Sequence, residues 1–242
     1  MTSYSHAVPT AGAVAALLVA TAPDATPQSE DLLWRTVAGR ALITWPLQAL
    51  SRCNEVVGCS ILATRAHATE GREALFSVPW SGGPSVSASF RDERTWLGIL
   101  ENGRTHTEWL VVVDANLPLV TPDAIRAGLL AAEKTGVAIA SEPVKETLKR
   151  VEGDIVVETL PRDALRRLIT PLVLRRDAVA AILGAYDDAR HDPNDLASLL
   201  ALAGVPITVF DAGYPAVRVN SEDDLAIVET LLLQRLSEAH PS

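Results

Sequence analysis

The run Leu110-Val111-Val112-Val113-Asp114-Ala115-Asn116-Leu117-Pro118-Leu119-Val120-Thr121-Pro122-Asp123 decides the fold of this chain. Its first four residues are apolar and predict a strand that is buried on both faces. Thr121, Pro122 and Asp123 then open a helix. Thr can cap it, Pro fits its first turn, and Asp complements the positive end of the helix dipole. Strand, Asp, short loop and helix in this order indicate one unit of a parallel α/β sheet.

Asp114 directly follows the predicted strand. In an open parallel sheet, ligands bind outside the carboxyl ends of the strands, and Asp114 is expected at such an end. A carboxylate there could hold a Mg²⁺ ion that carries phosphates. It could equally accept hydrogen bonds from the next loop, and the local pattern does not choose between these roles.

Composition and charge narrow the class of protein. The chain has 242 residues, of which 48% are hydrophobic and 21% charged, so it has ample material for the core of a single domain over residues 1–242. A net charge of −9 argues against nucleic acid as a partner. Cys53 and Cys59 are too few for a zinc site and are expected to be reduced and structural.

The segment 11–22 is apolar, but neither Lys nor Arg precedes it, so a signal peptide is not expected. It is also too short to span a bilayer. We interpret it as the first buried strand of a cytoplasmic protein that has no membrane partner.

Predicted strands alternate with predicted helices along the chain. Strands are expected at 14–21, 56–63, 110–113, 137–140, 207–210 and 216–219. Helices are expected at 42–52, 65–76, 91–101, 122–134, 177–186, 195–203 and 222–236, and a Pro/Gly/Ser loop at 78–87. Gly153-Asp154 lies between two β-type runs and predicts a hairpin. This alternation predicts a parallel α/β sheet with a hairpin inserted late.

Several motifs together point to a family. They are Asp114, Pro143–Arg150, Glu158–Arg162, Thr170-Pro171 and Val217-Arg218-Val219. In order and separation they resemble the 2-C-methyl-D-erythritol 4-phosphate cytidylyltransferase family of the non-mevalonate isoprenoid pathway. The resemblance runs from about Val14 to Leu236.

The resemblance implies a Rossmann-like nucleotidyltransferase fold with a three-layer sheet. It implies a homodimer in which the hairpin, at about residues 143–170, forms an arm that helps to build the neighbouring subunit's site. The family reaction joins CTP to methylerythritol phosphate and releases pyrophosphate. It relies on Mg²⁺ and on cationic side chains for positioning and charge neutralisation.

The same resemblance assigns roles to residues of this chain. Asp114 matches a metal ligand. Thr147, Arg162 and Thr170 match positions that bind the methylerythritol phosphate. Arg218 matches a catalytic phosphate-binding Lys and keeps its charge, although a planar guanidinium differs in geometry from an ammonium.

The nucleotide-binding loop departs from the family pattern. That loop is normally rich in glycine and lysine, whereas here no Gly or Lys lies between Ala20 and Gly39. Arg35 is the single cation of that stretch, and Arg40 directly follows Gly39. These two arginines are the candidates for nucleotide binding. An Arg of the central motif is replaced by Leu117, and a second acidic metal ligand by Pro215. We therefore expect CTP to bind weakly or not at all.

Three functions remain open at this point. The first is a working cytidylyltransferase that uses Arg35 or Arg40 in place of the lost cations. The second is a non-catalytic dimer that binds a sugar phosphate or a protein partner. The third is a nucleotidyltransferase with another substrate pair. We expect impaired or absent cytidylyl transfer, with the sugar-phosphate half of the site retained. The matching arm residues could alternatively serve only to fold the arm.

Overall fold

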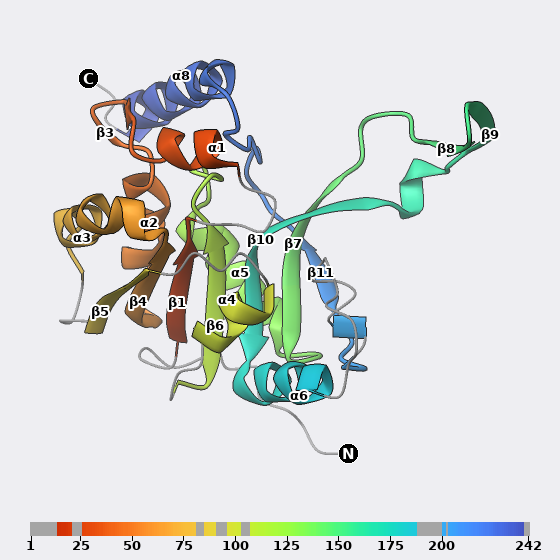
Figure 1. Cartoon of the computed structure of the whole chain (residues 1–242), viewed down its shortest axis with the longest axis horizontal. Helices are drawn as coiled ribbons and strands as arrows, with labels where there is room; N and C mark the ends of the chain where they lie inside the picture. The colour runs from red at the N-terminus through yellow and green to blue at the C-terminus, as the bar shows by residue number, and fades with distance from the viewer. Residues whose placement is uncertain are drawn as a thin grey trace.

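The computed structural model describes residues 14–20, 26–80, 85–90, 96–102, 107–187, 200–201 and 203–239. Its centre is a seven-stranded sheet in the order β11-β7-β10-β6-β1-β4-β5 (Figure 1). The strands are β1 (Val14–Val19), β4 (Val56–Ala63), β5 (Ser85–Phe90), β6 (Trp109–Asp114), β7 (Val137–Pro143), β10 (Arg166–Arg175) and β11 (Thr208–Asp211). Only β10 runs antiparallel to its neighbours, β6 and β7.

Helices cover both faces of the sheet. They are α1 (Pro27–Leu32), α2 (Thr44–Ser51), α3 (Ala68–Ser77), α4 (Trp96–Asn102), α5 (Pro122–Ala132), α6 (Arg176–Asp187) and α8 (Glu222–Ala239). Buried side chains of α2, α3, α5 and α8 belong to one apolar cluster, and those of α4 and α6 to a second. The predicted α/β fold with three layers is confirmed.

Strand β6 is buried on both faces, as its sequence predicts. Val111 and Val113 point into the first cluster, and Leu110 and Val112 into the second. Asp114 is the last residue of the strand, so the strand is longer than predicted. The following helix begins as expected, with the Thr121 hydroxyl accepting the Ala124 N–H at 3.1 Å.

The predicted hairpin is β8 (Lys149–Glu152) and β9 (Ile155–Thr159), and all residues of both strands are exposed. It lies on a long arm that leaves the sheet at the end of β7 and returns into β10 (Figure 1). The arm also carries a 3₁₀ turn at Arg162–Ala164. A short hairpin of β2 (Thr36–Val37) and β3 (Arg40–Ala41) lies apart from the main sheet.

The structure corrects several details of the sequence interpretation. The predictions missed β10, and residues 85–87 lie in β5 although a loop was predicted there. Residues 216–219 form no strand, since their backbone groups bond to Arg167 and to the Asn116 carbonyl instead of to a neighbouring strand. Residues 91–95 and 195–199 of two predicted helices lie outside the described residues.

The cysteines and the helices bear on two further points in the described part of the chain. Cys53 and Cys59 are free and buried, and burial raises the pKa of each thiol to about 12. Among the described helices, none is long and apolar enough to cross a membrane.

Two mid-helix glycines give a test of the packing between α5 and the sheet. A Cβ atom on Gly128 would lie 2.8 Å from Val173 Cγ2 and 2.9 Å from Phe210 Cζ, whereas one on Gly184 in α6 would meet no atom within 4 Å. Overpacking costs about 1–3 kcal/mol, against a gain of about 1 kcal/mol in helix propensity. We expect Gly128→Ala to lower the free energy of unfolding and Gly184→Ala to raise it, as measured by urea denaturation. Stabilisation by both changes would contradict the close contact at Gly128.

Candidate functional site

The candidate site lies at the carboxyl end of β6. Five residues meet there, and we call them the Asp114–Arg218 cluster: Asp114, Asn116, Thr170, Tyr214 and Arg218. Asp114 ends β6, and Asn116 lies in the turn after it. Thr170 belongs to β10, while Tyr214 and Arg218 lie in an irregular segment, residues 212–219, between β11 and α8. We call this segment the Arg218 segment.

Arg218 bridges two groups of the β6 end. Its Nη1 lies 2.5 Å from Asp114 Oδ2 and 3.0 Å from Asn116 Oδ1. The Asp114 side chain is 10% exposed and that of Arg218 is 25% exposed. The Asn116 N–H also donates to Asp114 Oδ1 at 3.4 Å. The carboxylate is thus held from two sides, and the Arg218 side chain remains partly exposed.

Thr170 and Tyr214 complete the cluster from β10 and the Arg218 segment. The Asp114 N–H donates to Thr170 Oγ1 at 2.9 Å, and the Tyr214 hydroxyl donates to the Thr170 carbonyl. Burial raises the pKa of Tyr214 above its usual value, and the negative charge of Asp114 raises it further. The Tyr214 hydroxyl therefore stays protonated and remains a donor throughout the physiological pH range.

Further contacts tether the Arg218 segment to the sheet. They join the Ala212 N–H to the Ser141 carbonyl (3.1 Å), Arg167 Nη2 to the Ala216 carbonyl (2.8 Å), and the Val219 N–H to the Asn116 carbonyl (2.9 Å). Ala212, Tyr214, Ala216 and Val219 are also buried in the core. Although it lacks regular secondary structure, this segment is firmly anchored.

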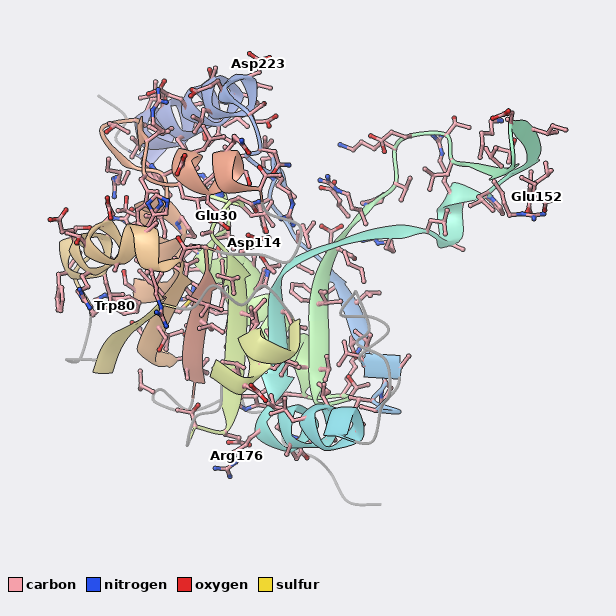
Figure 2. All side chains as sticks on the ribbon, viewed as in Figure 1. Glu30, Trp80, Asp114, Glu152, Arg176 and Asp223 are labelled. Atoms are coloured by element: carbon pink, nitrogen blue, oxygen red, sulfur yellow. The ribbon has the colours of Figure 1, made fainter. Side chains whose placement is uncertain are left out.

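Thr147 and Arg162, both predicted to bind substrate, lie on the arm. Thr147 is exposed, and Arg162 Nη1 donates to the Lys145 carbonyl at 3.0 Å across the arm. Figure 2 shows Asp114 at the end of the sheet and Glu152 far out on the arm. The structure therefore brings Asp114, Thr170 and Arg218 together, and it leaves Thr147 and Arg162 on the arm of the same chain.

Arg35 and Arg40, the predicted nucleotide-binding residues, both contact groups of the same chain. Arg35 Nη1 lies 2.7 Å from Glu222 Oε1, at the start of α8. The Arg40 guanidinium stacks on the Trp45 ring at 4.0 Å and donates to Gln48 Oε1 at 3.0 Å. Burial and the nearby Arg52 lower the pKa of Arg40.

Part of the predicted nucleotide loop is helical. In α1, the Ser29 N–H donates to Thr26 Oγ1 at 3.2 Å, and the Thr26 N–H donates to Ser29 Oγ at 2.9 Å. Pro27, at the start of this helix, has no N–H to donate. Glu30, in the first turn of the helix, is buried. Backbone donors of this stretch are thus used in the helix's own cap.

Sequence reasoning gave no role to Asn116 or Tyr214. Asn116 could have been noticed as a polar residue inside the apolar run that follows β6. Tyr214 has no such signal, because its partner Thr170 is 44 positions away.

Comparisons with known proteins agree with this architecture. A family model described as 2-C-methyl-D-erythritol 4-phosphate cytidylyltransferase matches residues 14–234. The protein of that name from Burkholderia vietnamiensis is 34% identical over 207 residues, which cover 82% of this chain and 86% of that protein. The one from Dehalococcoides mccartyi strain CBDB1 is 25% identical over 222 residues, or 90% of this chain and 96% of that protein.

Solved structures show the same fold. The 4-diphosphocytidyl-2C-methyl-D-erythritol synthase of Anaerococcus prevotii matches with a TM-score of 0.77 at 16% identity, covering 92% of this chain and 99% of its own. The cytidylyltransferase of Thermus thermophilus matches with a TM-score of 0.63 at 22% identity, covering 90% and 98%. With the family model matching almost its whole length, this chain belongs to the 2-C-methyl-D-erythritol 4-phosphate cytidylyltransferase family.

Proposed function

We propose that this chain binds a phosphorylated polyol of the methylerythritol phosphate class at the Asp114–Arg218 cluster, and that it transfers a cytidylyl group from CTP weakly or not at all. One contrast carries this proposal. Arg218 is held at the carboxyl end of β6 by Asp114 and Asn116, whereas the stretch that would hold the nucleotide includes the capped helix α1 with its buried Glu30.

Arg218 suits a phosphate ligand. A guanidinium carries five N–H donors in a planar fork, so it can contact a phosphate while it keeps its bond to Asp114. The position of the guanidinium is already fixed by Asp114 and Asn116. Binding therefore costs little side-chain entropy, and the Asp114 carboxylate directs the phosphate to the opposite side of the guanidinium by repulsion.

The Asp114–Arg218 cluster could hold Mg²⁺ only together with the phosphates of a bound ligand. Mg²⁺ is usually bound through one or two carboxylates together with substrate phosphates and waters. Asp114 would be the protein ligand here, although Arg218 already contacts its Oδ2. Among the described residues, no three His, Cys, Asp or Glu side chains converge on a metal position. Such an ion would supply neutralisation of phosphate charge.

The part of the site that would bind CTP is the reason to expect weak cytidylyl transfer. In the family reaction, the phosphate of the polyol attacks the α-phosphorus of CTP, so the triphosphate must be held in line with it. In this chain the capped helix α1, with buried Glu30, occupies part of the loop that would hold the triphosphate. A buried carboxylate and bonded N–H groups are unfavourable neighbours for a triphosphate.

We further propose a homodimer formed through the arm. The exposed apolar side chains on β8 and β9 include Ile155 and Val156, which would be stabilised by burial against a second copy. Thr147 and Arg162 belong to the same arm, between β7 and β10, and this arm extends away from the sheet (Figure 1). In a dimer the arm could bring them to the partner's Asp114–Arg218 cluster.

Ligand-dependent melting tests the binding half of the proposal. At ten times its dissociation constant, a ligand that binds only the native state stabilises it by about 1.4 kcal/mol, or about 3–6 °C for a chain of this size. We expect methylerythritol phosphate to give such a shift, and millimolar CTP with Mg²⁺ to give none. Arg218→Ala should weaken binding of the sugar phosphate at least tenfold, since a charged hydrogen bond is worth about 1.5–3 kcal/mol.

Arg175→Ala is the matched control, because Arg175 pairs with Asp177 and lies opposite Trp109, at the other end of β6 from Asp114. This variant should show the melting shift with methylerythritol phosphate, and its affinity for that ligand should stay within about twofold of the wild-type value. A clear shift with CTP, or equal shifts in wild type and Arg218→Ala, would contradict the proposal.

Light scattering at micromolar concentration tests the dimer. We expect wild type to be dimeric and the double variant Ile155→Asp/Val156→Asp to be monomeric, because two buried carboxylates would oppose the apolar contact. Phe76→Asp, at an exposed apolar residue of α3, should remain dimeric. A monomeric wild-type protein would refute the arm interface.

A further inference from the structure

Tyr214 holds together the two parts of the chain that carry Asp114 and Arg218. We propose that Tyr214 is a positioning residue, which fixes the Arg218 guanidinium against Asp114 by donating its hydroxyl to the Thr170 carbonyl. The role in substrate binding rests on the proposed function above, whereas the positioning of Arg218 does not.

An irregularity in β10 makes the Thr170 carbonyl available to Tyr214. The pairing of β10 with β7 shifts between Ile169 and Leu172, so Thr170 and Pro171 are skipped in the register. Pairing of β10 with β6 begins only at Leu172. Thr170 therefore has no paired residue in either neighbouring strand, and the carbonyl of this buried residue needs a donor from elsewhere. The Tyr214 hydroxyl is that donor.

Thr170 is connected to Asp114 through its other polar group. Its hydroxyl accepts the Asp114 N–H at 2.9 Å. One residue thus receives a hydrogen bond from the end of β6 and another from the Arg218 segment. Tyr214 precedes Arg218 by only four positions. The bond from the Tyr214 hydroxyl to β10 therefore helps to determine where the Arg218 segment passes the end of β6.

Loss of the hydroxyl alone should leave the fold intact. The Tyr214 ring packs in the core, and the Arg218 segment keeps its contacts from Arg167 to the Ala216 carbonyl and from Val219 to Asn116. Tyr214→Phe retains the ring and these contacts. It should therefore loosen the position of Arg218 more than it loosens the protein as a whole.

The experiment compares wild type, Tyr214→Phe and Thr135→Val. Thr135 Oγ1 donates to the Val137 carbonyl at 2.7 Å and also contacts Thr208 Oγ1 at 2.9 Å and the Val137 N–H at 3.4 Å. Thr135→Val therefore deletes at least as many hydroxyl contacts as Tyr214→Phe, but at the end of the sheet away from the Asp114–Arg218 cluster. The first readout is the solvent exchange of the Arg218 guanidinium protons by NMR, assigned with Arg218→Lys. The second is the affinity for methylerythritol phosphate by calorimetry.

We expect Tyr214→Phe to speed exchange of the Arg218 guanidinium protons about tenfold and to weaken sugar-phosphate binding about tenfold, the loss expected for one hydrogen bond. Thr135→Val should change neither. Unchanged exchange in Tyr214→Phe, equal effects in both variants, or loss of the fold in Tyr214→Phe would overturn the assignment. If wild type does not bind the sugar phosphate, the proposed function fails and the NMR readout still decides the role of Tyr214.

Discussion

The ion pair between Asp114 and Arg218 is the interaction on which the candidate site depends. It joins the last residue of a fully buried strand to a segment more than 100 positions later in the chain. The carboxylate is almost buried, so it needs a compensating charge, and removal of either partner would leave the other without one. The network of Asn116, Thr170 and Tyr214 keeps the two groups in register.

The two halves of the site differ in how firmly their cations are held. The pair between Arg35 and Glu222 is exposed, with side chains 61% and 62% accessible, and exposed pairs contribute only about 0–1 kcal/mol. A triphosphate could therefore displace Glu222 at small cost. Helix α1 presents the greater obstacle, because binding there would require its cap between Thr26 and Ser29 to open beside the buried Glu30.

The sequence predicted the elements whose local pattern is clear. The apolar run of β6, the Thr121 cap of α5 and the Gly153-Asp154 turn all formed where expected. Strand β10 was missed because arginines occupy both of its ends and Pro171 interrupts it, a pattern that does not resemble a central strand. Its antiparallel course follows from the arm, which reverses the chain before β10 enters the sheet.

The candidate site was predictable only in part. Asp114 was identified by its position directly after the buried strand, and Thr170 and Arg218 by their match to family motifs; the structure places the three together. Asn116 and Tyr214 were not identified, because their contacts with Arg218 and Thr170 depend on the tertiary fold and leave no periodic signal. Thr147 and Arg162 lie on the arm, which extends away from the sheet, so a role for them in binding at the cluster would require a second subunit.

The most direct test of this account is pyrophosphate release from CTP in the presence of Mg²⁺ and methylerythritol phosphate, with Asp114→Asn as the control. We expect folded wild-type protein to release pyrophosphate no faster than the Asp114→Asn variant. Rapid release by wild type that disappears in Asp114→Asn would contradict it, because the triphosphate would then be held productively despite the altered loop.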